Sequence, residues 1–204
     1  MNALVMAFFK APRPGTVKTR LGREIGHEPA TALYRRMAEE QLARIPAEMR
    51  AEVHYAPRGA KPDMTEWLGK RHYRAQAGGD LGARLNHAFL TGFRRGYRPV
   101  LAIGADCPDL DAACLRRAVL LLGSHDVVLG PATDGGYYLI GLRAPAPRLF
   151  ADIEWSTSTV LADTVQRAKA GGLSVAQLEE RLDIDDLASL KQHLGTGLPP
   201  VVAL

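Results

Sequence analysis

The sequence has few cysteines and no long hydrophobic run. Cys107 and Cys114 are the only cysteines in 204 residues, too few for a disulfide framework or a four-thiolate zinc site, so we expect a reducing compartment. The N-terminal apolar run ends at Lys10 and follows no charged segment, and it is too short for a signal peptide or a membrane span. We therefore expect a cytoplasmic protein with no membrane partner.

Two common nucleotide-binding motifs are missing from the loop that follows this run. Residues 10–21 include Gly15 but no second glycine directly before Lys18-Thr19, which a Walker A loop requires, and they do not contain the dinucleotide G-x-G-x-x-G pattern. The chain also has no internal repeat, low-complexity tract or long linker. We expect residues 1–204 to form one domain.

The charge is unevenly distributed along the chain. Residues 1–100 hold 18 Lys and Arg against 9 Asp and Glu, and residues 101–204 hold 8 against 13. The arginines are scattered along predicted helices and are not interleaved with aromatic residues, so we expect no nucleic-acid partner. A basic half facing an acidic half suits a site where phosphates meet a metal, although ordinary surface variation explains the asymmetry equally well.

Apolar runs of strand length alternate with segments of helical period. We expect strands at 3–9, 52–56, 72–75, 100–104, 126–129, 137–142 and 173–175, and helices at 29–45, 81–95, 110–122, 158–170 and 186–194. This alternation predicts an α/β fold with a doubly wound, mostly parallel sheet between two helical layers. Ligands of such sheets bind at the carboxyl ends of the strands. The loops after residues 9, 104 and 129 are therefore the candidate sites.

The loop after the first strand carries four cations, Lys10, Arg13, Lys18 and Arg20, with Gly15 among them. Four like charges repel one another unless an anion joins them. Arginine offers a planar fork and lysine a movable point charge for phosphate oxygens, so this loop is a candidate phosphate site with Lys18 as a candidate catalytic residue. A solvated basic loop is the alternative.

A carboxylate follows the strand at 100–104. Asp106 is the candidate catalytic ligand of Mg²⁺ or Mn²⁺, because such hard cations take oxygen ligands and Mg²⁺ usually takes one or two protein carboxylates. Asp109 and Asp111 are better interpreted as caps of the next helix. Asp183 and Asp185 share one face if their segment is extended, and one of them could complete the metal site. The alternative for that segment is an acidic turn that caps the last helix.

Glycines follow the strand at 126–129. Gly135 and Gly136 allow close backbone approach, so their amides can point at a bound oxyanion or hydroxyl, and Asp134 is a candidate catalytic acceptor ligand or base. The alternative is a tight hairpin with Asp-Gly turn chemistry. A weaker fourth site combines Gly79 with Arg84 and Asn86, since the neighbouring Asp80 is already expected to cap a helix.

Together these loops resemble a family of bacterial GT-A-fold proteins, a domain of unknown function (DUF2064) named as glycosyltransferases or nucleotide-diphospho-sugar transferases. The resemblance covers nearly the whole chain and five ordered motifs carry it: residues 10–21, 79–85, 104–108, 130–138 and 183–185. Residues 18–21 and Leu85-Asn86 with Ala88 are also similar to phospholactate guanylyltransferases, a nucleotidyltransferase branch of the same fold.

The resemblance implies a role for each motif. The basic loop would hold phosphates, Asp106 and Asp185 the metal, residues 79–86 the base and ribose, and the glycine loop the acceptor. Relatives often continue the last acidic motif with Thr-Pro-Glu-Asp, whereas this chain has Asp186-Leu187-Ala188-Ser189. The choice of Asp185 over Asp183 stays open.

The predicted activity is that of a metal-dependent transferase acting on a nucleoside triphosphate or nucleotide sugar and a small acceptor. An acceptor oxyanion could attack the α-phosphate and expel pyrophosphate, or a hydroxyl could attack the anomeric carbon of a sugar and expel a nucleoside diphosphate. A catalytically idle nucleotide sensor with the same fold is the alternative. The sequence does not determine the oligomeric state, and a homodimer is one option.

Overall fold

The computed structural model describes residues 2–195, which build one seven-stranded sheet in the order β3-β2-β1-β4-β6-β5-β7. β6 is antiparallel to both its neighbours, and the other pairs are parallel. This confirms the doubly wound, mostly parallel sheet. The strands are β1 Leu4–Lys10, β2 Arg50–Ala56, β3 Tyr73–Ala75, β4 Val100–Ile103, β5 Val127–Pro131, β6 Tyr137–Leu142 and β7 Val175–Gln177.

The predicted helices are present, along with three short elements that the sequence pattern did not indicate. The unpredicted ones are α1, α3 and the 3-10 helix η1, each too short to show an amphipathic period. No helix among the described residues is long and apolar enough to cross a membrane. The helices are α1 Thr19–Ile25, α2 His27–Arg44, α3 Lys61–Leu68, α4 Leu81–Arg94, α5 Ala112–Leu121, η1 Pro147–Phe150, α6 Val160–Ala170 and α7 Leu187–Gly195.

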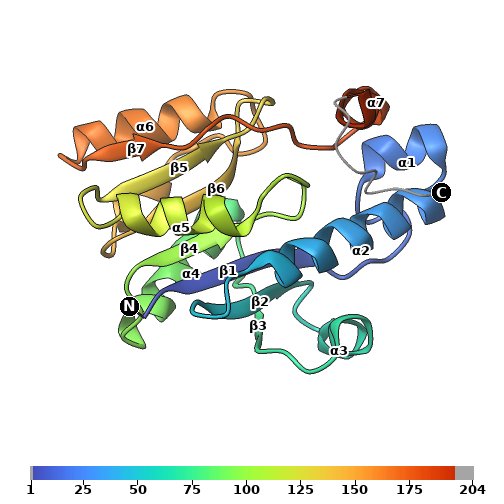
Figure 1. The fold of residues 1–204 in the computed structure, drawn as a ribbon, viewed down its shortest axis with the longest axis horizontal. Helices are drawn as coiled ribbons and strands as arrows, with labels where there is room; N and C mark the ends of the chain where they lie inside the picture. Colours follow the sequence, from blue (N-terminus) through green and yellow to red (C-terminus); the bar gives the residue numbers. More distant parts are fainter. Residues whose placement is uncertain (1, 196–204) are drawn as a thin grey trace.

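Helices cover both faces of the sheet, which gives the expected three layers (Figure 1). Alternate residues of β1 point to opposite faces. Val5 and Phe9 belong to a core with side chains of α2, α3 and α5, whereas Leu4 and Met6 belong to a core with side chains of α4, η1 and α6. Burial on both faces explains why β1 is a continuous apolar run.

The strand order reverses its direction of growth between β1 and β4. From β1 the chain adds β2 and β3 on one side, and it then crosses to form β4 on the other side of β1. The loops that leave the carboxyl ends of β1 and β4 therefore diverge from adjacent strands, the arrangement that creates a ligand crevice in this class of sheet. α1 and α7 pack together beside this crevice through Leu21, Ile184 and Leu190 (Figure 1).

Two predicted helix caps are confirmed. The Asp80 carboxylate accepts a hydrogen bond from the Ala83 amide at 2.8 Å, and the Asp111 carboxylate accepts one from the Cys114 amide at 2.7 Å. Asp109 does not cap α5, which begins after Asp111. The prediction of one domain over residues 1–204 also includes residue 1 and residues 196–204, which lie outside the described part of the chain.

Candidate nucleotide and metal site

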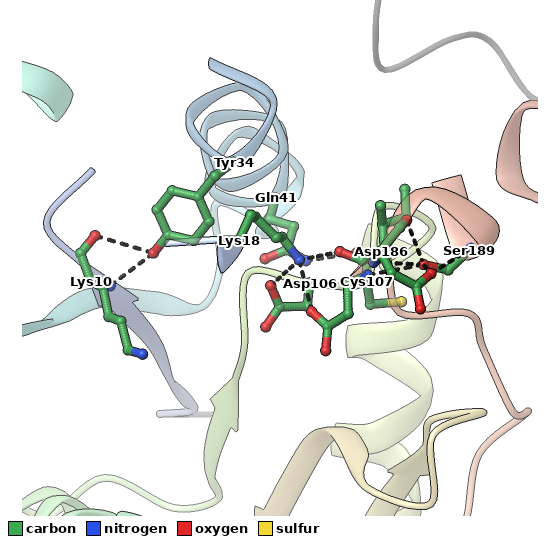
Figure 2. A network of polar contacts seen from close by, with 10 residues as sticks. Lys10, Lys18, Tyr34, Gln41, Asp106, Cys107, Asp186 and Ser189 are labelled. Carbon is green, nitrogen blue, oxygen red and sulfur yellow. Dashed lines mark hydrogen bonds and ion pairs between the residues drawn. The ribbon is translucent and has the colours of Figure 1, made fainter. Parts of the chain in front are cut away.

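Lys18 connects the basic loop to the acidic residues. It directly precedes α1 in a left-handed conformation with φ 45°, and 2% of its side chain is exposed. Its Nζ donates to the Asp106 carboxylate and to the Ile184 carbonyl, and it lies 3.3 Å from Oδ1 of Asp185. Figure 2 shows Lys18 reaching from the β1–α1 loop to Asp106. The structure therefore brings three sequence-predicted site residues together around one ammonium group.

The charge of Lys18 is stabilised by its partners. Burial by itself disfavours an ammonium ion, but the carboxylates of Asp106 and Asp185 outweigh that cost and raise the pKa of Lys18 above its ordinary value. The Lys18 ammonium is thus the positive centre of a group of carboxylates, Asp106, Asp183 and Asp185, that we call the acidic group.

Asp183 is the buried member of the acidic group. Its Oδ1 has no hydrogen-bond partner among the described residues. Burial, together with the neighbouring carboxylates of Asp106 and Asp134, raises the pKa of Asp183 to about 8. Because Asp134 contributes to this shift, the glycine loop lies close enough to the acidic group to share its electrostatic field.

The acidic segment, residues 183–186, is held in place by backbone hydrogen bonds and by a helix cap. The Ile184 amide donates to the Asp106 carbonyl at 2.9 Å, and the Leu21 amide donates to the Asp185 carbonyl at 3.2 Å. The Asp186 carboxylate accepts from the Ser189 amide at 2.8 Å at the start of α7. The acidic segment therefore divides its roles: Asp186 caps the helix, as one interpretation expected, while Asp185 faces Lys18.

Two cavities adjoin at Lys10 and Thr16, and the first of them reaches Lys18 and the acidic residues. The first has a volume of about 450 Å³ and is lined by Lys10, Thr16, Lys18, Arg20, Tyr34, Leu81, Asp106, Ser156 and Asp185, among others. The second has a volume of about 500 Å³ and is lined by Lys10, Arg13, Thr16, Arg58, Gln76, Gly78 and Arg84, among others. Lys10 and Thr16 border both cavities. Volumes of this size suit small-molecule ligands, and the lining charges suit anions.

The four cations of the basic loop have different partners. Lys18 is paired with carboxylates, and the Arg13 guanidinium is paired with Asp63 of α3 at 2.7 Å. The Lys10 backbone is held by the Tyr34 hydroxyl, which accepts from its amide at 2.8 Å and donates to its carbonyl at 3.1 Å (Figure 2). No ion pair engages the side chains of Lys10 and Arg20 within residues 2–195. Those two residues line the first cavity, and the Arg20 charge also contributes to lowering the pKa of Asp186.

The backbone of the basic loop contains one position that demands glycine. Gly15 has φ +77°, a conformation that side-chain-bearing residues rarely adopt, and an added Cβ would meet nothing within 4 Å. The reason for glycine here is therefore the turn itself, which leads the chain back toward Lys18.

The segment between Gly79 and Asn86 is only partly at the cavities. The Arg84 guanidinium lines the second cavity and donates to the Gly79 carbonyl at 2.9 Å. Asn86 lines neither of the two cavities, because it lies on a different face of α4 from Arg84. The structure therefore places Arg84, and not Asn86, beside the candidate ligand space.

The glycine loop is a tight hairpin between β5 and β6, which confirms the hairpin interpretation. The Asp134 carboxylate accepts from the Gly136 amide at 2.8 Å, and Gly135 has φ +86°. A Cβ on Gly135 would lie 2.1 Å from the Ser158 carbonyl oxygen, so the hairpin packs closely on the segment before α6. This geometry leaves the proposed acceptor role of Asp134, Gly135 and Gly136 as a prediction.

Sequence reasoning missed several residues that line the first cavity. Ser156 borders it with φ +68°, a strained conformation for a non-glycine residue of the kind that gathers at functional sites. Its hydroxyl makes no hydrogen bond within residues 2–195. Leu81, Thr16 and Tyr34 also border the cavity. Thr16 lies in the basic loop and Leu81 in the motif of residues 79–85, so only these two had a signal in the sequence.

The oxygens around Lys18 are of the kind that bind a divalent cation, although residues 2–195 contain no group of three or more His, Cys, Asp or Glu residues placed to hold one. Two carboxylates and the Ile184 carbonyl converge there, and all three offer oxygen ligands of the kind that Mg²⁺ and Mn²⁺ prefer. The side chains of Asp106 and Asp185 are each 44% exposed, so phosphate or water could fill the remaining coordination positions. Asp106 and Asp185 would hold such an ion.

The fold is an α/β fold of the GT-A type, which is that of the nucleotide-diphospho-sugar transferase superfamily. Residues 41–157 match the model of a family described as an uncharacterized protein conserved in bacteria (DUF2064). The chain belongs to this family, which confirms the resemblance. No curated protein is similar enough to match the sequence.

Solved structures support the same assignment. A Desulfovibrio desulfuricans G20 protein named for the nucleotide-diphospho-sugar transferases is 35% identical, with a TM-score of 0.92 over 97% of this chain and 89% of that one. CMP:2-keto-3-deoxy-manno-octonic acid synthetase complexed with CTP is 10% identical, with a TM-score of 0.59 over 96% and 98%. Rv0371C from Mycobacterium tuberculosis H37Rv, complexed with manganese, is 14% identical, with a TM-score of 0.56 over 95% and 98%. At such low identities the last two show the fold alone.

Proposed function

We propose that this protein is a metal-dependent transferase that binds a nucleoside triphosphate or nucleotide sugar and transfers a nucleotidyl or glycosyl group to a small acceptor. The observation that carries the proposal is the meeting of Lys18 with Asp106 and Asp185 where the strand order reverses, beside a cavity lined by further cations. A site that binds phosphates together with a divalent metal needs cations for the phosphates and carboxylates for the metal in the same place.

The two cavities divide the nucleotide between them. Lys10 and Arg20 line the first cavity and neutralise the phosphates, with Asp106 and Asp185 as the ligands of the metal. The second cavity, which contains Arg84 and Gln76, takes the base and ribose. When bound, Mg²⁺ or Mn²⁺ supplies charge neutralisation on the phosphates, which stabilises the leaving group.

The acceptor enters from the side of the β5–β6 hairpin. Asp134 orients or deprotonates the acceptor. Gly135 and Gly136 shape the hairpin that presents Asp134, because the Gly135 amide already donates to the Ala132 carbonyl and the Gly136 amide to the Asp134 carboxylate. The support for this role is electrostatic. Asp134 is among the charges that raise the pKa of the buried Asp183, so the Asp134 carboxylate lies near the acidic group. Orientation of the acceptor supplies much of the remaining barrier reduction.

A ligand panel tests this function. Thermal unfolding is measured with nucleoside triphosphates and nucleotide sugars, each with and without Mg²⁺ or Mn²⁺. A ligand at a hundred times its dissociation constant stabilises by about 2.7 kcal/mol, so a true ligand gives a clear metal-dependent rise in Tm. Asp106→Asn is the matched control and should lose that rise.

The products then separate the two chemistries. Release of pyrophosphate identifies nucleotidyl transfer, and release of a nucleoside diphosphate identifies glycosyl transfer. Metal-dependent binding without turnover across a panel of acceptors favours the idle sensor. The proposal is wrong if no nucleotide or nucleotide sugar stabilises the wild-type chain with either metal.

A further inference from the structure

The ammonium of Lys18 lies where a divalent cation would be held. It contacts both carboxylates of the candidate metal site and the Ile184 carbonyl between them. Only 2% of the Lys18 side chain is exposed, whereas each carboxylate is 44% exposed. The ammonium thus occupies the protein side of the site, and a dication bound to the same oxygens would meet it at contact distance, where two positive charges repel each other.

We propose that Lys18 is the resident counter-ion of the metal site, which keeps free divalent metal out until the phosphates of a nucleotide draw the ammonium away from Asp106 and Asp185. Metal then enters together with the nucleotide. This inference rests on the proposed function, and it adds a binding order to it. It also gives Lys18 two successive partners, carboxylates before binding and phosphates after it.

The surroundings of Lys18 allow this exchange. The Gly22 amide donates to the Lys18 carbonyl at 2.7 Å, which anchors the backbone at the start of α1. The side chain has four rotatable methylene groups and ends in a compact charge, so it can change partner without moving the backbone. Lys18 already borders the first cavity together with Lys10 and Arg20. Phosphates bound there provide the alternative anion.

A titration of Mn²⁺ alone tests the inference. Free Mn²⁺ is followed by electron paramagnetic resonance with the nucleotide-free wild type, Lys18→Met and Lys10→Met. Lys18→Met keeps the length of the side chain but leaves Asp106 and Asp185 without their counter-ion. Lys10→Met removes one charge from the same cavity without touching either carboxylate, and therefore controls for the general electrostatic effect.

We expect Lys18→Met to bind Mn²⁺ at least about tenfold more tightly than the wild type, within the usual range of coupling between two sites. Lys10→Met should gain much less Mn²⁺ affinity than Lys18→Met. Mn²⁺ should also raise the Tm of Lys18→Met more than that of the wild type. Lys18→Gln, whose amide can still donate to the Ile184 carbonyl, repeats the test if Lys18→Met does not fold.

Equal or weaker Mn²⁺ binding by the Lys18 variants would overturn the inference, and so would a gain of the same size in Lys10→Met. Because this titration contains no nucleotide, its failure leaves the proposed function standing. Conversely, a failed nucleotide panel removes the proposed function without changing the Mn²⁺ result.

Discussion

The side-chain nitrogen of Lys18 donates to the carboxylate of Asp106, although 88 positions separate the two residues in the sequence. Each residue belongs to a loop at the carboxyl end of a strand, and β1 and β4 are adjacent in the sheet. The contact is therefore a product of the strand order. The same ammonium lies 3.3 Å from Asp185, close to the C-terminal end of the described residues.

Substitution should distinguish the two proposed metal ligands, Asp106 and Asp185, from the neighbouring Asp183. Asp106→Asn and Asp185→Asn should fold but lose metal-dependent nucleotide stabilisation, because a neutral amide is a poor ligand for a hard dication. Asp183→Asn should retain more of it, since the ion pairs of Lys18 within residues 2–195 are with Asp106 and Asp185 and not with Asp183. Tm shifts with and without Mg²⁺ measure the difference. A larger loss in Asp183→Asn than in Asp185→Asn would move the second ligand to Asp183.

The phosphate contacts should depend on Arg20 more than on Arg13. Arg20→Ala should weaken triphosphate binding ~10- to 100-fold, because a charged hydrogen bond contributes about 1.5–3 kcal/mol. Arg13→Ala should cost less, since Asp63 already pairs with Arg13. Titrations with the mono-, di- and triphosphate of one base measure both variants. Nucleotidyl transfer predicts the largest loss for the triphosphate, whereas glycosyl transfer predicts similar losses for diphosphate and diphosphate sugar.

The hairpin carboxylate should affect turnover and not nucleotide affinity. Asp134→Ala should lower kcat by about 10²–10⁴-fold if Asp134 is the base. Nucleotide binding should stay nearly intact. Asp134→Asn is the matched control, because its amide oxygen can still accept from the Gly136 amide as the carboxylate does at 2.8 Å. Recovery of turnover in Asp134→Asn would show that Asp134 only shapes the turn. A large loss of nucleotide affinity in either variant would contradict the acceptor role.

A buried carboxylate away from the site should make stability depend on pH. Glu52 is 2% exposed and accepts from Arg95 at 2.6 and 2.8 Å and from Arg74 at 3.0 Å. Burial opposes its charge, but the hydrogen bonds and charges of these arginines outweigh that cost and hold the pKa of Glu52 far below its usual range. The stabilisation is complete above the unfolded pKa of about 4.3 and is lost as pH falls from there toward the folded pKa.

Glu52→Gln should therefore lower the free energy of unfolding by about 1–3 kcal/mol at pH 7, since both arginines remain partly exposed. The difference from the wild type should shrink between pH 5 and pH 3, by the linkage of protonation to folding. Urea unfolding of both proteins at several pH values measures it. A difference that stays constant down to pH 3 would show that the carboxylate charge is not responsible.

Gly82 should tolerate no side chain. A Cβ there would lie 2.6 Å from the Phe150 carbonyl oxygen and 2.7 Å from Nε1 of Trp155. Gly82→Ala should therefore destabilise by about 1–3 kcal/mol through overpacking. Gly78→Ala, where a Cβ would meet nothing within 4 Å, is the control and should leave the Tm nearly unchanged. Equal Tm values for the two variants would contradict a packing role for Gly82.

Local patterns in the sequence predicted the elements and their caps. The apolar run from Ala3 to Phe9 indicated a strand buried on both faces, and Asp80 and Asp111 were identified as helix caps, because these features depend on a few neighbouring residues. Short helices escaped prediction since two turns show no clear period. That omission had a consequence at the site: α3 carries Asp63, which pairs with Arg13, a partner for this predicted phosphate-binding cation that the sequence pattern did not indicate.

The sequence by itself determined the order of the elements, the class of fold and the charged loops from which a site could be built, because hydrophobic period, capping and turn chemistry are read locally. Only the tertiary structure decided which charges meet. The crossover from β3 to β4 sets the Asp106 loop beside the basic loop, and the packing of α7 against α1 sets Asp185 beside Lys18. Distances between loops follow from strand order and helix packing, which no local pattern encodes.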